Sequence, residues 1–271
     1  MEGDGPPRFV ERHQILASGY APRMTLPFVI ERLPSVDSTQ SEARRRLEAG
    51  RAPQQLVLVA DEQSAGRGRR GHTWHAHART SLMFTAVLAP PELERPARFL
   101  LLVAVAAARA LEQCGAPDIS IKWPNDLFVG DRKLGGLIAE QLRGPQGPAL
   151  LLGVGINLSA PASALPAEIA RRATHAGLSP GFATRDRVLR QVLTELGSLL
   201  KALGTPTEPA WQLDFRRRSW LDGRDVEILS AGERFAARVA SVSAEGDLLL
   251  SDGRLLRGEH VESVQLIARS E

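Results

Sequence analysis

Residues 133–157 read KLGGLIAEQLRGPQGPALLLGVGIN, two apolar segments around a turn at 144–147. This arrangement predicts a β-hairpin. Each strand of the hairpin contains two glycines, Gly135-Gly136 in the first strand and Gly153 and Gly155 in the second. Glycines inside a strand allow a ligand or a second stretch of backbone to approach closely. We therefore expect this hairpin to offer a sheet surface that admits a flat ring.

Strands and helices are mixed before residue 218 and short alternating strands alone follow it, which predicts an α+β protein. We expect a catalytic domain over residues 27–218, with a mixed β-sheet flanked by helices. Residues 219–271 are expected to form a small β-barrel, because glycine turns recur through them. Residues 1–26 predict a flexible lead-in. The expected strands of the first domain lie at 28–33, 55–60, 81–88, 119–123, 133–142 and 149–157, and its helices at 40–49, 95–113, 184–203 and 208–217.

The composition is that of an ordinary globular protein. The chain has 271 residues, of which 43% are hydrophobic and 24% charged, and this excludes a disordered or collagen-like chain. Its net charge of +3 is too weak a field to imply nucleic-acid binding by itself. The single cysteine, Cys114, excludes an intrachain disulfide, and no apolar run is long enough to span a bilayer. We therefore expect a soluble, cytoplasmic protein that does not enter a membrane.

Lysine is rare in this sequence. Only three of the 34 basic residues are lysines, namely Lys122, Lys133 and Lys201, so arginine supplies the general surface charge. A lysine retained against this bias is expected where an ammonium group is required. Lys133 opens the hairpin, and we expect it to neutralise a carboxylate or a developing phosphate charge. For Lys122, which opens the segment KWPND at 122–126, a solvent-facing position at a strand edge is the competing interpretation.

A glycine- and arginine-rich segment follows an expected strand, because residues 63–71 read QSAGRGRRG. The glycines let the backbone approach a ligand closely, and the arginines present planar donor forks suited to phosphate or carboxylate. The spacing is not that of a P-loop or of a dinucleotide-binding fingerprint. From the residues alone, three interpretations stay open: a small-ligand anion site, a solvated basic loop and an RNA-binding segment.

Two shorter segments also carry polar groups to element ends. Ser38-Thr39-Gln40 opens a helix, where a plain N-cap is the simplest interpretation and a polar ligand group the alternative. The stretch 39–42 fits a capping box. Asn157 ends the hairpin. Its amide is expected either to hydrogen-bond a flat ring of a ligand or to belong to a bulge followed by a turn. Three nearby histidines lack the spacing of metal ligands, so we expect no metal site at His72, His75 and His77.

Together these segments resemble the biotin protein ligases, the biotin–[acetyl-CoA-carboxylase] ligase family, in order and spacing over residues 28–268. GRGRRG at 66–71 and KWPND at 122–126 carry the resemblance most specifically. It implies a class II synthetase-like mixed sheet followed by an SH3-like barrel. It also implies a two-step reaction assisted by Mg²⁺. The biotin carboxylate attacks the α-phosphate of ATP, giving biotinyl-5′-AMP and pyrophosphate, and a lysine of a biotin carboxyl carrier protein domain then attacks the mixed anhydride.

The same resemblance implies roles for individual residues. Lys133 would bind the biotin carboxylate, while Arg67 and Arg69 would neutralise the two anions, which makes these three the expected catalytic residues. The loop that carries GRGRRG and leads on to Trp74, here called the arginine loop, would fold over the adenylate and exclude water. The expected biotin-binding residues are Ser38, Thr39, Gln40, Gln63, Arg67, Gly68, Arg69, Lys133 and Gly136. The expected ATP-binding residues are Arg69, Arg70, Trp74, Asn125, Asp126, Lys133 and Asn157, of which Asn125 and Asp126 orient Lys133, the nucleotide or Mg²⁺.

The sequence departs from the family pattern in three places. His72 and Thr73 follow GRGRRG, where a basic residue is common at the first of these positions. Family members often have Asn where Gln40 stands, and fewer than 30 residues precede the first strand, too few for the helix-turn-helix that some members carry. We therefore expect a ligase that does not bind DNA, as a monomer or a homodimer. A lipoate ligase or octanoyl transferase of the same superfamily is the first alternative. A nucleic-acid-binding module is the second, and the aromatic content of 5% argues against it.

Overall fold

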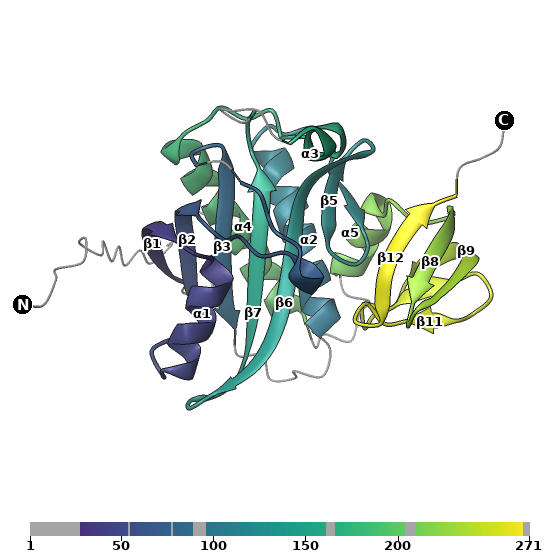
Figure 1. The fold of residues 1–271 in the computed structure, drawn as a ribbon, viewed down its shortest axis with the longest axis horizontal. Helices are drawn as coiled ribbons and strands as arrows, with labels where there is room; N and C mark the ends of the chain where they lie inside the picture. The colour runs from purple at the N-terminus through teal and green to yellow at the C-terminus, as the bar shows by residue number, and fades with distance from the viewer. Residues whose placement is uncertain are drawn as a thin grey trace, which may run out of the picture.

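The computed structural model describes residues 28–53, 55–76, 78–88, 96–160, 166–203 and 210–267, so the expected lead-in at 1–26 and His77 lie outside the described residues. Within these ranges, no helix combines the length and the apolar character that a membrane crossing requires. The elements, labelled as in Figure 1, are β1 (Val29–Val36), α1 (Thr39–Glu48), β2 (Leu56–Gln63), the 3₁₀ turn η1 (Arg69–Gly71), β3 (Ser81–Leu88), α2 (Pro96–Gln113), β4 (Ser120–Lys122), β5 (Asp126–Val129), β6 (Arg132–Gly144), β7 (Gly147–Asn157), α3 (Ala167–Arg172), α4 (Phe182–Ala202), α5 (Ala210–Arg218), β8 (Asp225–Ser230), β9 (Glu233–Val242), β10 (Leu248–Leu250), β11 (Leu255–Leu256) and β12 (Val261–Leu266).

A large mixed sheet forms the first part of the structure. Its strand order is β1-β2-β3-β7-β6-β5-β4, with β1 and β2 parallel and every other neighbouring pair antiparallel. The expected hairpin is confirmed as β6 and β7, closed where Gly144 pairs with Gly147. In its register Gly136 lies opposite Gly155, so the strand glycines gather on neighbouring positions of the sheet. The α+β class predicted from the sequence is confirmed.

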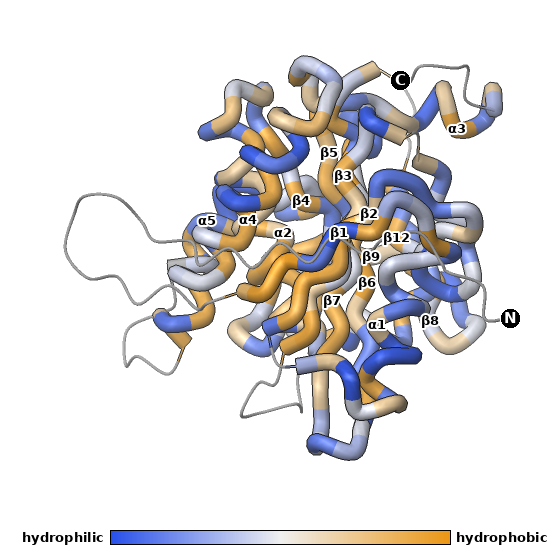
Figure 2. The backbone as a smooth tube through the Cα atoms, turned by 90° about the vertical axis from the view of Figure 1, so that its left-hand side faces the viewer, coloured by the Kyte–Doolittle hydropathy of each residue, from blue (hydrophilic) through white to orange (hydrophobic). Residues whose placement is uncertain are grey.

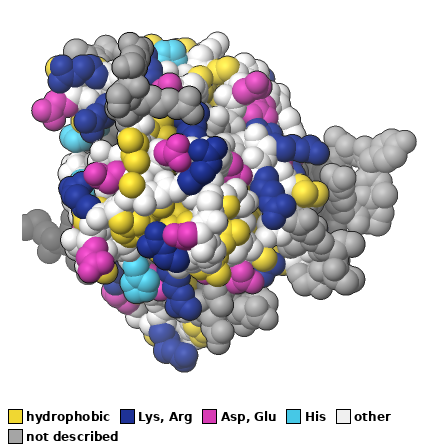
Figure 3. All heavy atoms as spheres, turned by 90° about the vertical axis from the view of Figure 1, so that its right-hand side faces the viewer, with side chains coloured by type: hydrophobic (Ala, Val, Ile, Leu, Met, Phe, Trp, Pro, Cys, Tyr) yellow, Lys and Arg dark blue, Asp and Glu magenta, His cyan; other side chains and the backbone are white. Residues whose placement is uncertain are grey.

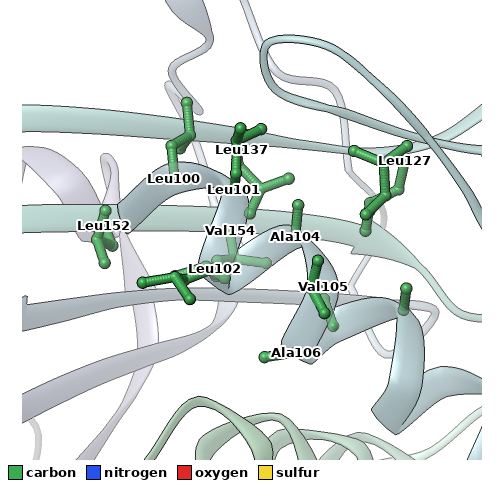
Figure 4. Close-up of a cluster of buried hydrophobic side chains, with 14 of the residues drawn as sticks. Leu100, Leu101, Leu102, Ala104, Val105, Ala106, Leu127, Leu137, Leu152 and Val154 are labelled. Atoms are coloured by element: carbon green, nitrogen blue, oxygen red, sulfur yellow. The ribbon is translucent and has the colours of Figure 1, made fainter. Parts of the chain in front are cut away.

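Helices cover both faces of this sheet. Helix α1 packs on one face, while α2 and α4 pack against each other on the opposite face (Figure 1). Strand β2 is apolar along its length because both of its faces are buried. Leu56 and Leu58 face α1, and Val57 and Val59 belong to the core around α2 and α4. Figure 4 shows Leu101 and Val105 of α2 beside Leu137 and Val154 of the hairpin. Apolar segments run along the strands and α2 in Figure 2, so the core lies between these layers.

The predicted elements agree with the structure apart from details at their ends. Ser38 is the N-cap of α1, and its hydroxyl accepts from the Gln40 N–H at 3.2 Å. The capping box expected at 39–42 was therefore placed one residue too late, and the Glu42 carboxylate instead pairs with Arg45 and Arg46. Strand β5 and helix α3 were not predicted, because segments this short carry too little periodicity to be recognised.

A second, five-stranded antiparallel sheet follows helix α5, and we call β8–β12 the C-terminal sheet. Its strand order is β11-β10-β9-β8-β12. The prediction of a small all-β unit at the end of the chain is confirmed, whereas its closure into an SH3-like barrel stays a prediction. On the face of the molecule shown in Figure 3, basic, acidic and apolar side chains are interspersed. Within the C-terminal sheet, the exposed side chains of Arg234 and Glu227 form an ion pair across β8 and β9.

The C-terminal sheet rests on the KWPND segment. The buried indole of Trp123 donates to the Gly246 carbonyl at 2.9 Å. At a second glycine, Gly258, an added Cβ would lie 3.3 Å from Cβ of Pro124 and 3.5 Å from the Trp123 ring. Trp123 and Pro124 therefore contact two turns of the C-terminal sheet. The segment that carries Asn125 and Asp126 thus also joins the two sheets.

We predict that Trp123→Phe lowers the free energy of unfolding by about 1–3 kcal/mol, because it leaves the buried Gly246 carbonyl without its donor. The measurement is urea unfolding followed by circular dichroism. Trp220→Phe is the matched control, since its indole donates to Asp131, whose side chain is 81% exposed and can turn to water. Equal losses in the two variants would show that the buried hydrogen bond has no special weight.

Candidate active site

One cavity of about 260 Å³ lies between the start of α1, the arginine loop and the β5–β7 part of the large sheet. Every site residue predicted from the sequence lines this cavity except Asn157. These lining residues are Ser38, Thr39, Gln40, Gln63, Arg67, Gly68, Arg69, Arg70, Trp74, Asn125, Asp126, Lys133 and Gly136. The fold thus brings together segments far apart in the chain, since Ser38 and Gly136 are 98 residues apart and Glu262 lines the same cavity.

The end of the cavity beside α1 is uncharged and polar. Thr39 and Gln40 are 4% and 2% exposed, and both contact the hydroxyl of Thr85, at 2.9 Å and 3.1 Å respectively. The Gln63 carbonyl oxygen accepts from the Thr39 N–H at 2.7 Å. The first turn of a helix leaves such N–H groups without intrahelical partners, so a side chain from β2 satisfies one here. This end offers both donors and acceptors without a net charge.

The wall formed by β6 and β7 is glycine-rich because the loop side chains lie directly on it. An added Cβ at Gly155 would come within 2.5 Å of the Trp74 indole, and one at Gly153 within 2.6 Å of the Gln40 side chain. Both approaches are closer than real Cβ contacts allow, so residues larger than glycine would displace these side chains. The indole N–H of Trp74 is buried without a hydrogen-bond partner among the described residues. Such a donor calls for an acceptor from a ligand or water.

Lys133 and Asp126 form the charged centre of the cavity. Strand β6 carries Lys133 and the adjacent β5 begins at Asp126, and Nζ lies 2.8 Å from Oδ1 of the carboxylate. The pair lies directly beside Gly136, where an added Cβ would be 3.5 Å from the Lys133 ammonium, an ordinary van der Waals distance. The Lys133 side chain is 38% exposed, so the ammonium is held in position and still open to the cavity.

The arginine loop faces this centre. Arg69 donates to the Asn125 side-chain carbonyl at 3.0 Å and to the Gly258 carbonyl at 2.7 Å. Burial lowers the pKa of its guanidinium, and the neighbouring charge of Arg70 lowers it further. Arg67 is more exposed and lies 3.4 Å from the Glu140 carboxylate of β6. The cavity therefore gathers several cations around few anions, and such a site is stabilised when an anionic ligand binds.

Asn157 lies elsewhere. It lines a second cavity of about 210 Å³ together with His75, Thr174 and Ser159. Its amide donates to the Thr174 carbonyl at 3.1 Å. The Ser159 hydroxyl is buried in this second cavity and has no hydrogen-bond partner among the described residues. Trp74 lines the first cavity and its chain neighbour His75 lines the second, so the two cavities are adjacent along the chain at this point.

Lys122 does not project freely into solvent, contrary to the competing interpretation of the sequence. Its ammonium lies 5.0 Å from the ring centroid of Trp220 and 5.6 Å from that of Phe128. Burial lowers the pKa of Lys122, the Asp126 carboxylate raises it and the Lys133 ammonium lowers it further. Lys122 therefore belongs to the same charge cluster as Asp126 and Lys133, and it lies against the Trp220 ring.

Sequence reasoning missed several residues of the site, among them Thr85 and Glu262, and also Glu140 beside it. Thr85 had a signal, because it is the polar residue in the middle of the otherwise apolar strand SLMFTAVL at 81–88. Glu140, the partner of Arg67, had none, since a glutamate in an amphipathic strand is ordinary. Glu262 lines the cavity from β12 of the C-terminal sheet, and only the tertiary fold brings it there. Within the described residues, no cluster of three His, Cys, Asp or Glu side chains is placed to hold a metal ion.

Comparison with known proteins identifies the relatives of this arrangement. A model of the biotin/lipoate A/B protein ligase family matches residues 33–157, which contain all the motifs of the cavity. The structure aligns with the biotin protein ligase of Aquifex aeolicus, solved in complex with biotin and ATP, with a TM-score of 0.74 and 27% identity over 88% of this chain and 99% of that one. The part of the chain that carries the motifs of the cavity is thus similar to the biotin/lipoate A/B protein ligase family.

Two relatives in sequence bear names that state an activity. The biotin–[acetyl-CoA-carboxylase] ligase of Mycobacterium tuberculosis is 29% identical over 80% of this chain and 80% of its own length. The bifunctional ligase/repressor BirA of Bacillus spizizenii is 31% identical over 148 residues, which are 54% of this chain. The chain spans about half the length of that BirA relative, 45%.

Lys122 gives a pH-dependent prediction. Because burial depresses its folded-state pKa below the usual 10.5, the folded protein binds fewer protons than the unfolded chain between these values, and stability contributed by this group rises with pH there. Lys122→Met removes the effect. In urea unfolding, the free energy of unfolding of the wild type relative to Lys122→Met should therefore rise as the pH increases over the alkaline range up to 10.5. A difference that stays constant across this range would contradict the buried charge.

Proposed function

We propose that this protein is an ATP-dependent biotin ligase, which forms biotinyl-5′-AMP and transfers biotin to a lysine of a biotin carboxyl carrier protein domain. The observation that carries the proposal is one cavity with an uncharged polar end at Thr39, Gln40 and Thr85 and a cationic centre at Lys133. A ligand that fits both ends has a neutral hydrogen-bonding head and an acid group. The family relatives named as biotin ligases favour biotin as that ligand.

The polar end suits the ureido ring of biotin. A urea carries two N–H donors and one carbonyl acceptor, and the buried hydroxyl and amide groups of Thr39, Gln40 and Thr85 can take both roles. The Gln40 amide also lies against Gly153, where a larger residue would push it out of place. Ring recognition therefore depends on Gln40, in the place where family members often carry Asn. The Gln side chain has one more methylene group than Asn, so its amide lies farther from the backbone.

The charged centre suits the adenylation step. Lys133 is placed to hold the biotin carboxylate, while Asp126 fixes its ammonium and Arg69, anchored on Asn125, stands opposite. The carboxylate and the α-phosphate of ATP are both anions, so their approach requires cations positioned beforehand. A carboxylate oxygen forms the new bond to phosphorus as the bond to pyrophosphate breaks, which gives the mixed anhydride. The same ammonium then stabilises the carbonyl oxygen when the carrier lysine attacks and AMP leaves.

The nucleotide side is proposed to extend from Trp74 towards the second cavity. The unpartnered indole N–H of Trp74 and the unpartnered hydroxyl of Ser159 are both buried, and an adenosine moiety offers acceptors to each. Asn157 lines the same second cavity, so its predicted part in ATP binding concerns this end and not the charged centre.

The residues present fit a magnesium ion that is held chiefly by the substrate. Mg²⁺ is commonly bound through one or two carboxylates together with nucleotide phosphates and waters. Asp126 and Asn125 lie side by side in the cavity and supply oxygens of this kind. Bound there, Mg²⁺ would lower the negative charge of the triphosphate, and Lys133 would still hold the biotin carboxylate.

The test of this proposal is pyrophosphate exchange into ATP, with purified protein and Mg²⁺ and with biotin, lipoate or octanoate in parallel reactions. Exchange that requires biotin supports the adenylation step. Exchange with lipoate or octanoate alone would move the protein to the lipoate side of its family. The polar ring end argues for biotin, because the dithiolane ring of lipoate has no hydrogen-bonding group to offer there.

We predict that Lys133→Ala lowers biotin-dependent exchange by about 100-fold or more, since it removes the preorganised cation at the reacting carboxylate. Lys201→Ala is the matched control, because it removes the same group from an exposed position at the end of α4. Normal exchange by Lys133→Ala would refute the role given to this lysine.

For Arg69 we predict that Arg69→Ala releases the adenylate about tenfold faster, because a charge-assisted contact at the phosphate is lost. The rate is measured by chasing labelled biotinyl-5′-AMP from the protein with unlabelled ligand. An unchanged release rate would place Arg69 outside the adenylate site.

A further inference from the structure

One carboxylate of the active site lies between two ammonium groups. Strand β5 has β4 on one side and β6 on the other, and Asp126 at its start lies opposite Lys122 of β4. Residues directly opposite each other in an antiparallel pair project from the same face of the sheet. From the β6 side, Nζ of Lys133 lies 2.8 Å from Oδ1 of Asp126. Two of the three lysines in the sequence thus lie around this carboxylate.

The surroundings of Lys122 hold its ammonium in place without neutralising it. Nζ lies 5.0 Å from the ring centroid of Trp220 and 5.6 Å from that of Phe128, and both of these residues are buried. Aromatic rings attract a cation but carry no net charge. Burial lowers the pKa of Lys122, the Asp126 carboxylate raises it and the Lys133 ammonium lowers it. The charges that reach Lys122 are therefore those of the Asp126–Lys133 pair.

A count of charges shows what Lys122 adds to the charged centre. The two ammonium groups and the one carboxylate leave one positive charge in excess, and an acid ligand on Lys133 brings this set to neutrality. Without Lys122, the ligand carboxylate and Asp126 would be two anions sharing one ammonium. Like charges in one site disfavour each other's ionised form. Arg69 adds a further cation, but it is anchored on Asn125 and faces the phosphate in the proposed reaction.

We propose that Lys122 is a positioning residue that acts through Asp126 to raise the affinity of Lys133 for a ligand carboxylate. Lys122 is not among the residues that line the cavity, so this effect requires no contact with the ligand. The proposal rests on the proposed function in taking the ligand to be biotin, whose acid group binds at Lys133. The two lysines then differ in task, because Lys133 touches the acid and Lys122 balances the carboxylate that holds Lys133.

The experiment is a calorimetric titration of the full-length protein with biotin and with biotinamide, its uncharged analogue, in the absence of ATP. Lys122→Met replaces the ammonium with an apolar group that can stay against the two rings. We expect the dissociation constant for biotin to rise about tenfold in Lys122→Met, and the constant for biotinamide to stay as in the wild type. Lys201→Met is the matched control, because it removes the same charge from an exposed position at the end of α4.

A double-mutant cycle tests whether the effect passes through Asp126. In an Asp126→Asn background, Lys122→Met should change the dissociation constant for biotin by less than about twofold, because no second carboxylate is then left to balance. Lys122→Arg keeps the positive charge and should bind biotin more tightly than Lys122→Met does. An equal loss of affinity in both backgrounds would overturn the proposal, and so would an equal loss for biotin and biotinamide.

A measurement without ligand keeps this proposal separate from the proposed function. Urea unfolding of the same variants reports the interaction of Lys122 with Asp126 in the free protein. Asp126→Asn should lower the midpoint of unfolding less in a Lys122→Met background, since it then leaves one ammonium unpaired and not two. Equal shifts in the two backgrounds would overturn the proposal even if biotin did not bind. A protein that shows this coupling but no pyrophosphate exchange would count against the ligase function alone.

Discussion

The close approach of the arginine loop to the glycine-lined wall of the large sheet determines the rest of this structure. Gly153 and Gly155 on β7 lie against Gln40 and Trp74, at distances where a methyl group does not fit. The hairpin register places Gly136 of β6 opposite Gly155, and the Lys133 ammonium lies beside this pair. One surface of two strands thus admits an amide, an indole and a cation side by side. A site for a ring joined to an acid requires such a surface.

Charge is distributed across this surface so that a ligand completes it. Lys133, Arg67 and Arg69 surround the cavity, and Asp126 and Glu140 neutralise them only in part. Burial and the charge of neighbouring Arg70 lower the pKa of Arg69, so its positive charge is unfavourable at this position. The backbone carbonyls of Gly258 and Glu259 offset some of this effect by accepting hydrogen bonds from Arg69 and Arg70. An anionic substrate then meets cations that are already in place.

The fold and most of the cavity could be predicted from local sequence, because the informative segments carry their own chemistry. Two glycine pairs identified the hairpin wall, the scarcity of lysine drew attention to Lys133, and the apolar runs identified strands buried on both faces. Contacts that depend on tertiary structure could not be predicted in this way. Glu140 and Glu262 are ordinary surface-type residues in their own strands, and only the tertiary fold brings Glu140 to Arg67 and Glu262 to the cavity. The placement of Asn157 in a second cavity likewise depends on the path of the chain beyond β7.

The central claim is that one cavity holds the acid and the nucleotide on either side of Lys133. A crystal structure of the protein with a non-hydrolysable analogue of biotinyl-5′-AMP tests it most directly. The account predicts the ureido ring beside Thr39, Gln40 and Thr85, the acyl oxygen on the Lys133 ammonium and the adenosine extending past Trp74 towards Asn157. An analogue bound with its acyl group away from Lys133, or with the ring and the nucleotide in exchanged positions, would contradict it.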